Sequence, residues 1–72
     1  MNRKLYPIWK VNIKRYKYSV KSHYWFDSKE RAIKFIEKQK ELNPEWEYTK
    51  PEYIGSYTKG NAEILLGYQI EE

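Results

Sequence analysis

The pattern of apolar and polar residues predicts a strand near the start of the chain. Between residues 8 and 14 the two kinds of side chain alternate. The apolar set is Trp9, Val11 and Ile13, and the polar set is Lys10, Asn12 and Lys14. Successive side chains of a strand point to opposite faces of its sheet. The alternation is therefore typical of a half-buried strand with a basic outer row.

The phase of this alternation changes after Lys14. The next apolar positions are Tyr16, Tyr18 and Val20. A slip by one residue moves every side chain to the other face, so a turn or a bulge must intervene. We expect a hairpin turn or a strong bend near residues 15–17. A second strand should then end with the aromatic run at residues 24–26.

A helix is predicted over about residues 28–42. Asp27 is the expected N-cap, because its side chain can accept the N–H of Glu30 while Glu30 reaches back, as in a capping box. The apolar stripe along the helix consists of Ala32, Ile33, Phe35, Ile36 and Leu42. Asn43 and Pro44 end the helix, since proline disfavours helical backbone at the residue before it.

The last third of the chain is predicted to return to strands. Residues 46–50 and 53–57 alternate, with Pro51 as an interruption, and residues 59–61 carry a turn signal. From residue 62 onward, alternate positions are apolar. They are Ala62, Ile64, Leu66, Tyr68 and Ile70. This period of two indicates a final strand. A helix is the alternative for residues 62–66, but Gly67 and the continuation argue against it.

The predicted order of elements is ββαββ, within one small domain covering residues 1–72. We expect an α+β fold, in which an antiparallel sheet of about four strands carries one helix packed on one face. The opposite face is then either polar or covered by a partner. Leu65 falls on the polar phase of the final strand and is our candidate for self-association. A homodimer formed there would compensate for the small core of a 72-residue chain.

Composition narrows the classes of protein that the chain can represent. There is no cysteine, which excludes disulfides and thiolate metal clusters. The longest apolar runs are three residues, too short for a transmembrane helix or the core of a signal peptide. We therefore expect a cytoplasmic protein with no membrane partner.

Charge and aromatic residues together suggest a nucleic-acid surface. Residues 1–26 carry seven bases and no acid, whereas the rest carries seven bases and ten acids. Bases of a nucleic acid would stack on the tyrosines while lysines meet phosphate. The candidate contacts are Lys10, Lys14, Arg15, Tyr16, Lys17, Tyr18 and Lys21. The alternative is a solvated row of lysines that guards a sheet edge.

The chain also holds eight tyrosines and three tryptophans. A buried tyrosine hydroxyl needs a hydrogen-bond partner, so some of these rings should lie half-exposed against the domain or a partner. Tyrosine and tryptophan are frequent anchors of protein interfaces. The alternative is that aromatic residues simply favour strands.

Candidate catalytic chemistry is sparse. His23 is the only histidine, with Asp27 four residues on, and no nucleophile-elbow sequence accompanies them. One histidine without cysteine cannot build a typical zinc site, and no phosphate-binding glycine motif or calcium loop is present. We expect no catalytic, cofactor-binding or metal-binding residues, no enzyme activity, no cofactor and no small-molecule substrate.

Residues 9–42 resemble a known pattern. Trp9-x-Val11-x-Ile13, a basic turn and Phe26-x-Ser28-Lys29-Glu30-x-Ala32-x-x-Phe35 are similar to the AP2-like arm-binding domain of phage and transposon integrases. That family places a three-stranded sheet, backed by a helix, in a DNA groove. The resemblance implies that Lys10, Lys14, Arg15 and Lys17 face DNA. In size and composition the chain also resembles small lysine- and tyrosine-rich phage and prophage proteins of low-GC Gram-positive bacteria, which implies no activity.

These observations predict a non-catalytic interaction module. It would bind a protein partner, or a second copy of itself, through an aromatic sheet face or edge. The alternative is a DNA- or RNA-binding module that uses the basic N-terminal hairpin.

Overall fold

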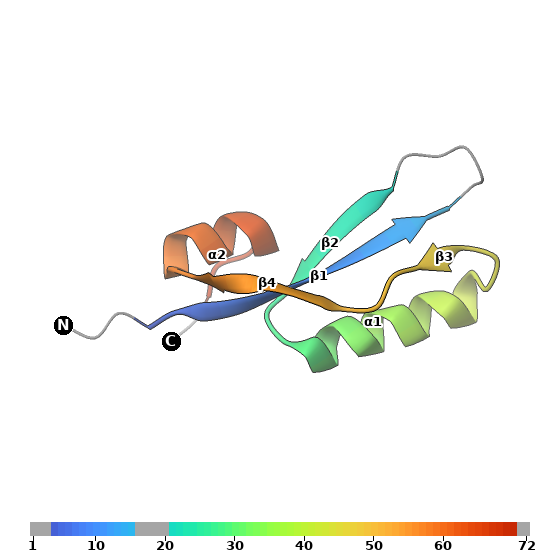
Figure 1. Ribbon diagram of the computed structural model, residues 1–72, viewed down its shortest axis with the longest axis horizontal. Helices are drawn as coiled ribbons and strands as arrows, with labels where there is room; N and C mark the ends of the chain where they lie inside the picture. The colour runs from blue at the N-terminus through green and yellow to red at the C-terminus, as the bar shows by residue number, and fades with distance from the viewer. Residues whose placement is uncertain (1–3, 16–20, 71–72) are drawn as a thin grey trace.

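The computed structural model describes residues 4–15 and 21–70. Its elements are β1 (Tyr6–Lys14), β2 (Ser22–Phe26), α1 (Lys29–Leu42), β3 (Glu47–Tyr48), β4 (Glu52–Tyr57) and α2 (Lys59–Leu66). They form an antiparallel four-stranded sheet with two helices (Figure 1). The predicted α+β class is confirmed, with a second helix in place of the expected final strand.

Strand β1 lies at the centre of the sheet. β2 pairs along one edge, with Trp9 opposite Phe26. β3 and β4 both pair along the other edge, at opposite ends of β1. Between them, Asn12 donates its N–H to the Thr49 side chain (2.8 Å), and the Thr49 N–H donates to the Asn12 carbonyl (3.0 Å). β3 and β4 therefore act as one interrupted third strand.

The two helices pack on opposite faces of this sheet and at opposite ends (Figure 1). Tyr6 and Ile8 of β1 pack with Ala62 of α2. Three residues further on, Val11 and Ile13 point the other way, and they pack with Ala32 and Ile36 of α1. The expected helix on one face is thus present as α1, and α2 adds a second helix on the other face. The sheet therefore has two small cores, one on each face.

The aromatic run at the end of β2 serves both cores. Tyr24 and Phe26 pack on the α1 side, where each ring contacts Phe35 at about 5 Å between centroids (5.1 and 5.0 Å). Trp25 points to the other face and packs on the α2 side. A strand that is covered on both faces is apolar without alternation, which explains the continuous run.

The predicted final strand is wrong, because residues 59–66 are helix α2. Ala62, Leu65 and Leu66 are spaced for one face of a helix, whereas the alternation that predicts a strand uses Ala62, Ile64 and Leu66. Gly67 has a left-handed φ of 82°, and its N–H donates to the Glu63 carbonyl (2.9 Å). Glycine in this conformation is a common helix terminator. Gly67 therefore ends the helix and does not argue against it.

Leu65 consequently does not lie on a polar strand face. It is half-buried in α2, where it packs against the cluster of Tyr6, Ile8 and Ala62. Its role in self-association stays a prediction. The exposed strand position that led to this prediction does not exist in the structure.

The start of α1 also differs from the prediction. The N-cap is Ser28, whose side chain accepts the N–H of Arg31 (3.1 Å). Asp27 instead forms an ion pair with Arg31 (3.5 Å) and accepts a hydrogen bond from the Tyr68 hydroxyl (3.1 Å). This cluster joins the segment after α2 to the start of α1.

Farther along the predicted stripe, Leu42 is 64% exposed, because the helix extends beyond the sheet contacts that bury Ile36.

The α1 core should depend strongly on Ile36. We expect Ile36→Ala to lower the free energy of unfolding by about 2–5 kcal/mol, because the change removes buried methyl groups and leaves a cavity. Ile64→Ala is the matched control, since Ile64 is 79% exposed on α2. Chemical denaturation measures both variants. Equal, small losses would contradict the helix orientation.

Candidate functional site

Each helix covers only half of the sheet face on which it packs. Within the described residues, 4–15 and 21–70, the other half of each face is therefore uncovered. One uncovered half lies on the α1 side, toward the start of β1. We call it the aromatic half-face and define it by Pro7, Trp9, Tyr53 and Ser56, which the register places opposite one another in pairs. None of the four belongs to either core cluster.

Two rings dominate the aromatic half-face. Trp9 and Tyr53 face each other across β1 and β4, with ring centroids 5.3 Å apart and planes tilted by 58°. Tyr53 is 51% exposed. Its hydroxyl shares a hydrogen bond with Ser56 (2.7 Å), and the Lys29 ammonium lies 5.9 Å from the centre of the Trp9 ring. The result is an open aromatic surface with polar groups at its border.

The second uncovered half lies on the α2 side, toward the end of β1. It carries most of the predicted nucleic-acid contacts that fall within the described ranges. Lys10 and Lys14 share this face with Asn12, and the register adds His23 and Trp25 from β2. The His23 ring is hydrogen-bonded to the Asn12 side chain and contacts the ring of Trp25. We call this surface the polar half-face.

Acidic residues accompany the bases of the polar half-face. Glu52 lies directly across from Lys10, and Glu47 lies directly across from Lys14. Lys21 joins Lys14 and Glu47 around a shallow hollow of about 140 Å³. The basic row from β1 therefore runs beside an acidic row from β3 and β4. This arrangement weakens the attraction of the surface for a polyanion.

Arg15 lies on the opposite face from Lys10 and Lys14. Its guanidinium donates hydrogen bonds to the Ser22 and Tyr24 side chains and lies 5.1 Å from the ring centre of Trp46. These contacts hold the end of β1 against β2. Three other predicted contacts, Tyr16, Lys17 and Tyr18, lie outside the described residues.

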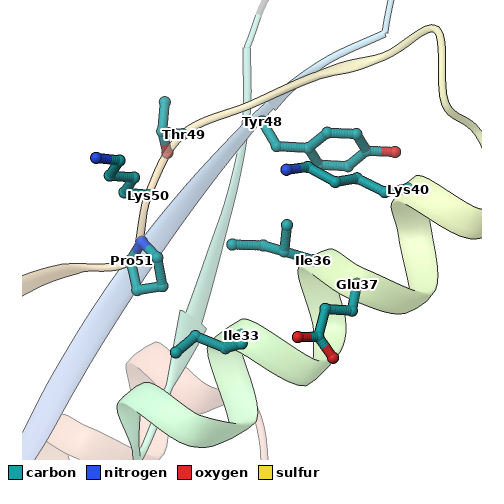
Figure 2. A pocket seen from close by; sticks show the side chains of 8 residues that line it. All are labelled: Ile33, Ile36, Glu37, Lys40, Tyr48, Thr49, Lys50 and Pro51. Carbon is teal, nitrogen blue, oxygen red and sulfur yellow. The ribbon is translucent and has the colours of Figure 1, made fainter.

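A groove separates α1 from residues 49–51, the link between β3 and β4 (Figure 2). Its volume is about 250 Å³. The lining residues are Ile33, Ile36, Glu37, Lys40, Tyr48, Thr49, Lys50 and Pro51. The alternation pattern does not reveal this groove, because it arises from the path of an irregular link beside a helix. The nearest signal in the sequence is the interruption at Pro51.

Tyr48 forms one end of the groove. Its hydroxyl donates to the Asn43 carbonyl (2.8 Å), and the Lys40 ammonium lies 6.0 Å from its ring centre. Burial, and then the nearby Glu45 carboxylate, raise the pKa of Tyr48. Burial and the Asp27 carboxylate likewise raise the pKa of Tyr68, although Arg31 opposes the shift. Ionisation of both phenols is thus disfavoured relative to an ordinary tyrosine.

No cluster of three or more histidine, cysteine, aspartate or glutamate side chains suited to a metal ion occurs within residues 4–15 and 21–70. In the same ranges, neither helix has the length and apolar character needed to cross a membrane.

Comparison with protein-family models, curated proteins and solved structures gives no match. The resemblances to AP2-like arm-binding domains and to phage proteins therefore stay predictions.

The raised tyrosine pKa values predict a sensitivity to alkaline pH. The folded state holds the phenol protons of Tyr48 and Tyr68 more tightly than the unfolded state does. Their contribution to stability is complete below about pH 10 and is lost as pH rises through the higher folded pKa. The free energy of unfolding should therefore fall above this pH, and less so in the Tyr48→Phe, Tyr68→Phe double variant. An unchanged alkaline profile in that variant would contradict the assignment.

Proposed function

We propose that this chain is a non-catalytic interaction module that binds protein through the aromatic half-face. The observation that supports the proposal is the contact between the half-buried Trp9 and the exposed Tyr53 on a sheet surface that neither helix covers. Tryptophan and tyrosine are the residues that most often dominate the energy of protein interfaces. A second copy of the chain is one such partner, and would give a homodimer.

A partner that removes both rings from water would gain binding energy by doing so. An aromatic side chain offers about 150–250 Å² of surface, and apolar burial stabilises by about 25 cal/mol per Å². Tyr53 is 51% exposed and Trp9 is half-buried, so burial of the remaining surface still leaves a gain of a few kcal/mol, the size of an interface hot spot. The Tyr53 and Ser56 hydroxyls and the Lys29 ammonium would bind polar groups of the partner around this centre.

A second candidate function is DNA or RNA binding through the polar half-face. It is supported by Lys10, Lys14 and Lys21, which share an open surface with the ring of His23, beside the half-buried Trp25. We rank it below protein binding for two reasons. Glu47 and Glu52 lie directly across from two of the lysines, and the Arg15 guanidinium already has partners on the other face.

The cytoplasmic location stays a prediction.

The protein-binding proposal can be tested by selection of partners. A library of displayed peptides and small domains would be selected against the wild-type chain, and each binder measured against the Trp9→Thr, Tyr53→Thr double variant. Threonine keeps a strand-forming residue at both positions. We expect at least tenfold weaker binding, about 1.4 kcal/mol, because the aromatic anchors are lost. Equal melting temperatures would show that the variant is folded.

Ile64→Ser is the matched control, since it removes an exposed apolar side chain from α2, outside the aromatic half-face. Binders that tolerate the double variant but lose affinity for Ile64→Ser would overturn the proposal. A monomeric mass together with failure to select any binder would also count against it.

The nucleic-acid alternative makes a separate prediction. If the polar half-face binds DNA, the mass measured by light scattering with a short duplex should rise at low salt and return to the free value as salt increases. The Lys10→Glu, Lys14→Glu variant should abolish the rise. A mass that is indifferent to DNA at low salt would exclude this function.

A further inference from the structure

We propose that the groove between α1 and the β3–β4 link receives one apolar side chain of an acidic, extended segment of the partner protein. The inference rests on the proposed function and specifies the chemistry of the partner. It is carried by the shape of the groove, its charges and its position relative to the aromatic half-face.

The facing walls of the groove are largely apolar, and its charged lining residues lie around them. Ile33 and Ile36 supply the helix side, and Tyr48 and Pro51 supply the strand side (Figure 2). Ile33 is 37% exposed, although it belongs to the apolar stripe of α1, so part of that stripe is left open to the groove. Burial of this surface by an apolar side chain is favourable.

The size of the groove favours a single side chain. Pockets for small molecules usually hold about 300–1,000 Å³, and this one holds about 250 Å³. It is also open along one side, because the β3–β4 link covers only part of α1 (Figure 2). An open, side-chain-sized hollow is typical of an anchor site for a peptide segment, in which the rest of the segment lies outside the hollow.

The charged groups around the groove favour an acidic segment. Lys40 lies on the helix side and Lys50 on the strand side, whereas Glu37 is the single carboxylate among the lining residues. The lining thus carries one excess positive charge, in a molecule that is positive overall. Carboxylates that flank the apolar anchor would lie near both ammonium groups, and such complementarity selects the partner and increases its rate of association.

The position of the groove makes it continuous with the proposed interface. Tyr53 follows Pro51 by two residues along the third strand, and Ile33 follows Lys29 by one helical turn. Lys29 contacts the ring of Trp9, and residues four apart lie on one side of a helix. The groove and the aromatic half-face therefore both lie on the α1 side of the sheet. One extended segment can reach both.

The test uses three synthetic pentapeptides with blocked ends. The first has one phenylalanine between two pairs of acidic residues, the second has the same phenylalanine between two pairs of lysines, and the third is acidic with alanine at the centre. Titration followed by NMR of the isotope-labelled chain reports both affinity and location. We expect the first peptide to shift the signals of Ile33, Ile36 and Lys50, and the alanine peptide to bind at least fivefold more weakly.

Charge reversal separates local from general electrostatics. Lys40→Glu with Lys50→Glu should weaken the acidic peptide about tenfold and should strengthen the lysine peptide. The matched control is Lys34→Glu with Lys38→Glu, which changes the net charge equally but reverses exposed lysines of α1 that do not line the groove. The control should alter affinity by less than twofold at physiological salt, where distant exposed charges are screened.

Three results would overturn the inference. They are signal shifts outside the groove, equal loss of affinity in both double variants, or equal binding of the phenylalanine and alanine peptides. These failures can be told apart from failure of the proposed function. If selected partners still depend on Trp9 and Tyr53 while the peptides ignore the groove, only the present inference is wrong. If the peptides bind the groove while partners ignore Trp9 and Tyr53, only the aromatic half-face is wrong.

Discussion

The structure depends on a change of buried face within one strand. Ile8 points to the α2 side and Val11 to the α1 side, and both are fully buried. A small chain usually gathers its apolar side chains on one face of a sheet. This chain divides them between two faces, so each helix covers only half of its face. The two uncovered halves of the sheet, one aromatic and one polar, follow directly from this division.

The break in the third strand has a similar consequence for α1. Residues 49–51 separate β3 from β4, and Pro51 within this link cannot donate a backbone hydrogen bond. The chain between β3 and β4 is therefore irregular beside the helix, which leaves Ile33 partly open. Both surfaces proposed for binding thus arise where a regular element stops covering its neighbour. The buried residues of the two cores support both of these surfaces.

Much of the framework could be predicted from local signals. The alternation at Trp9, Val11 and Ile13 correctly indicates β1, and Pro44 follows the end of α1 at Leu42. The final helix cannot be predicted from local signals, because residues 62–66 fit both the helical period and the strand period. The packing against Tyr6 and Ile8, which decides between them, joins residues that are remote in sequence. The uncovered surfaces cannot be predicted from local sequence patterns either, because they also depend on contacts between residues that are remote in sequence. Lys10 and Lys14 were correctly assigned to one face, whereas the acidic residues opposite them depend on the register of β3 and β4.

The nine residues of β1 run through both cores, to which the aromatic run of β2 also contributes. At about 3.3 Å per residue the strand is about 30 Å long, a large part of the 48 Å length of the molecule. Helix α2 contributes to one core and helix α1 to the other, so we expect the two ends to open with different free energies. Amide hydrogen exchange would then follow two distinct protection levels, divided near the middle of β1. A ligand that rigidifies one end would leave the exchange rates of the other end largely unchanged.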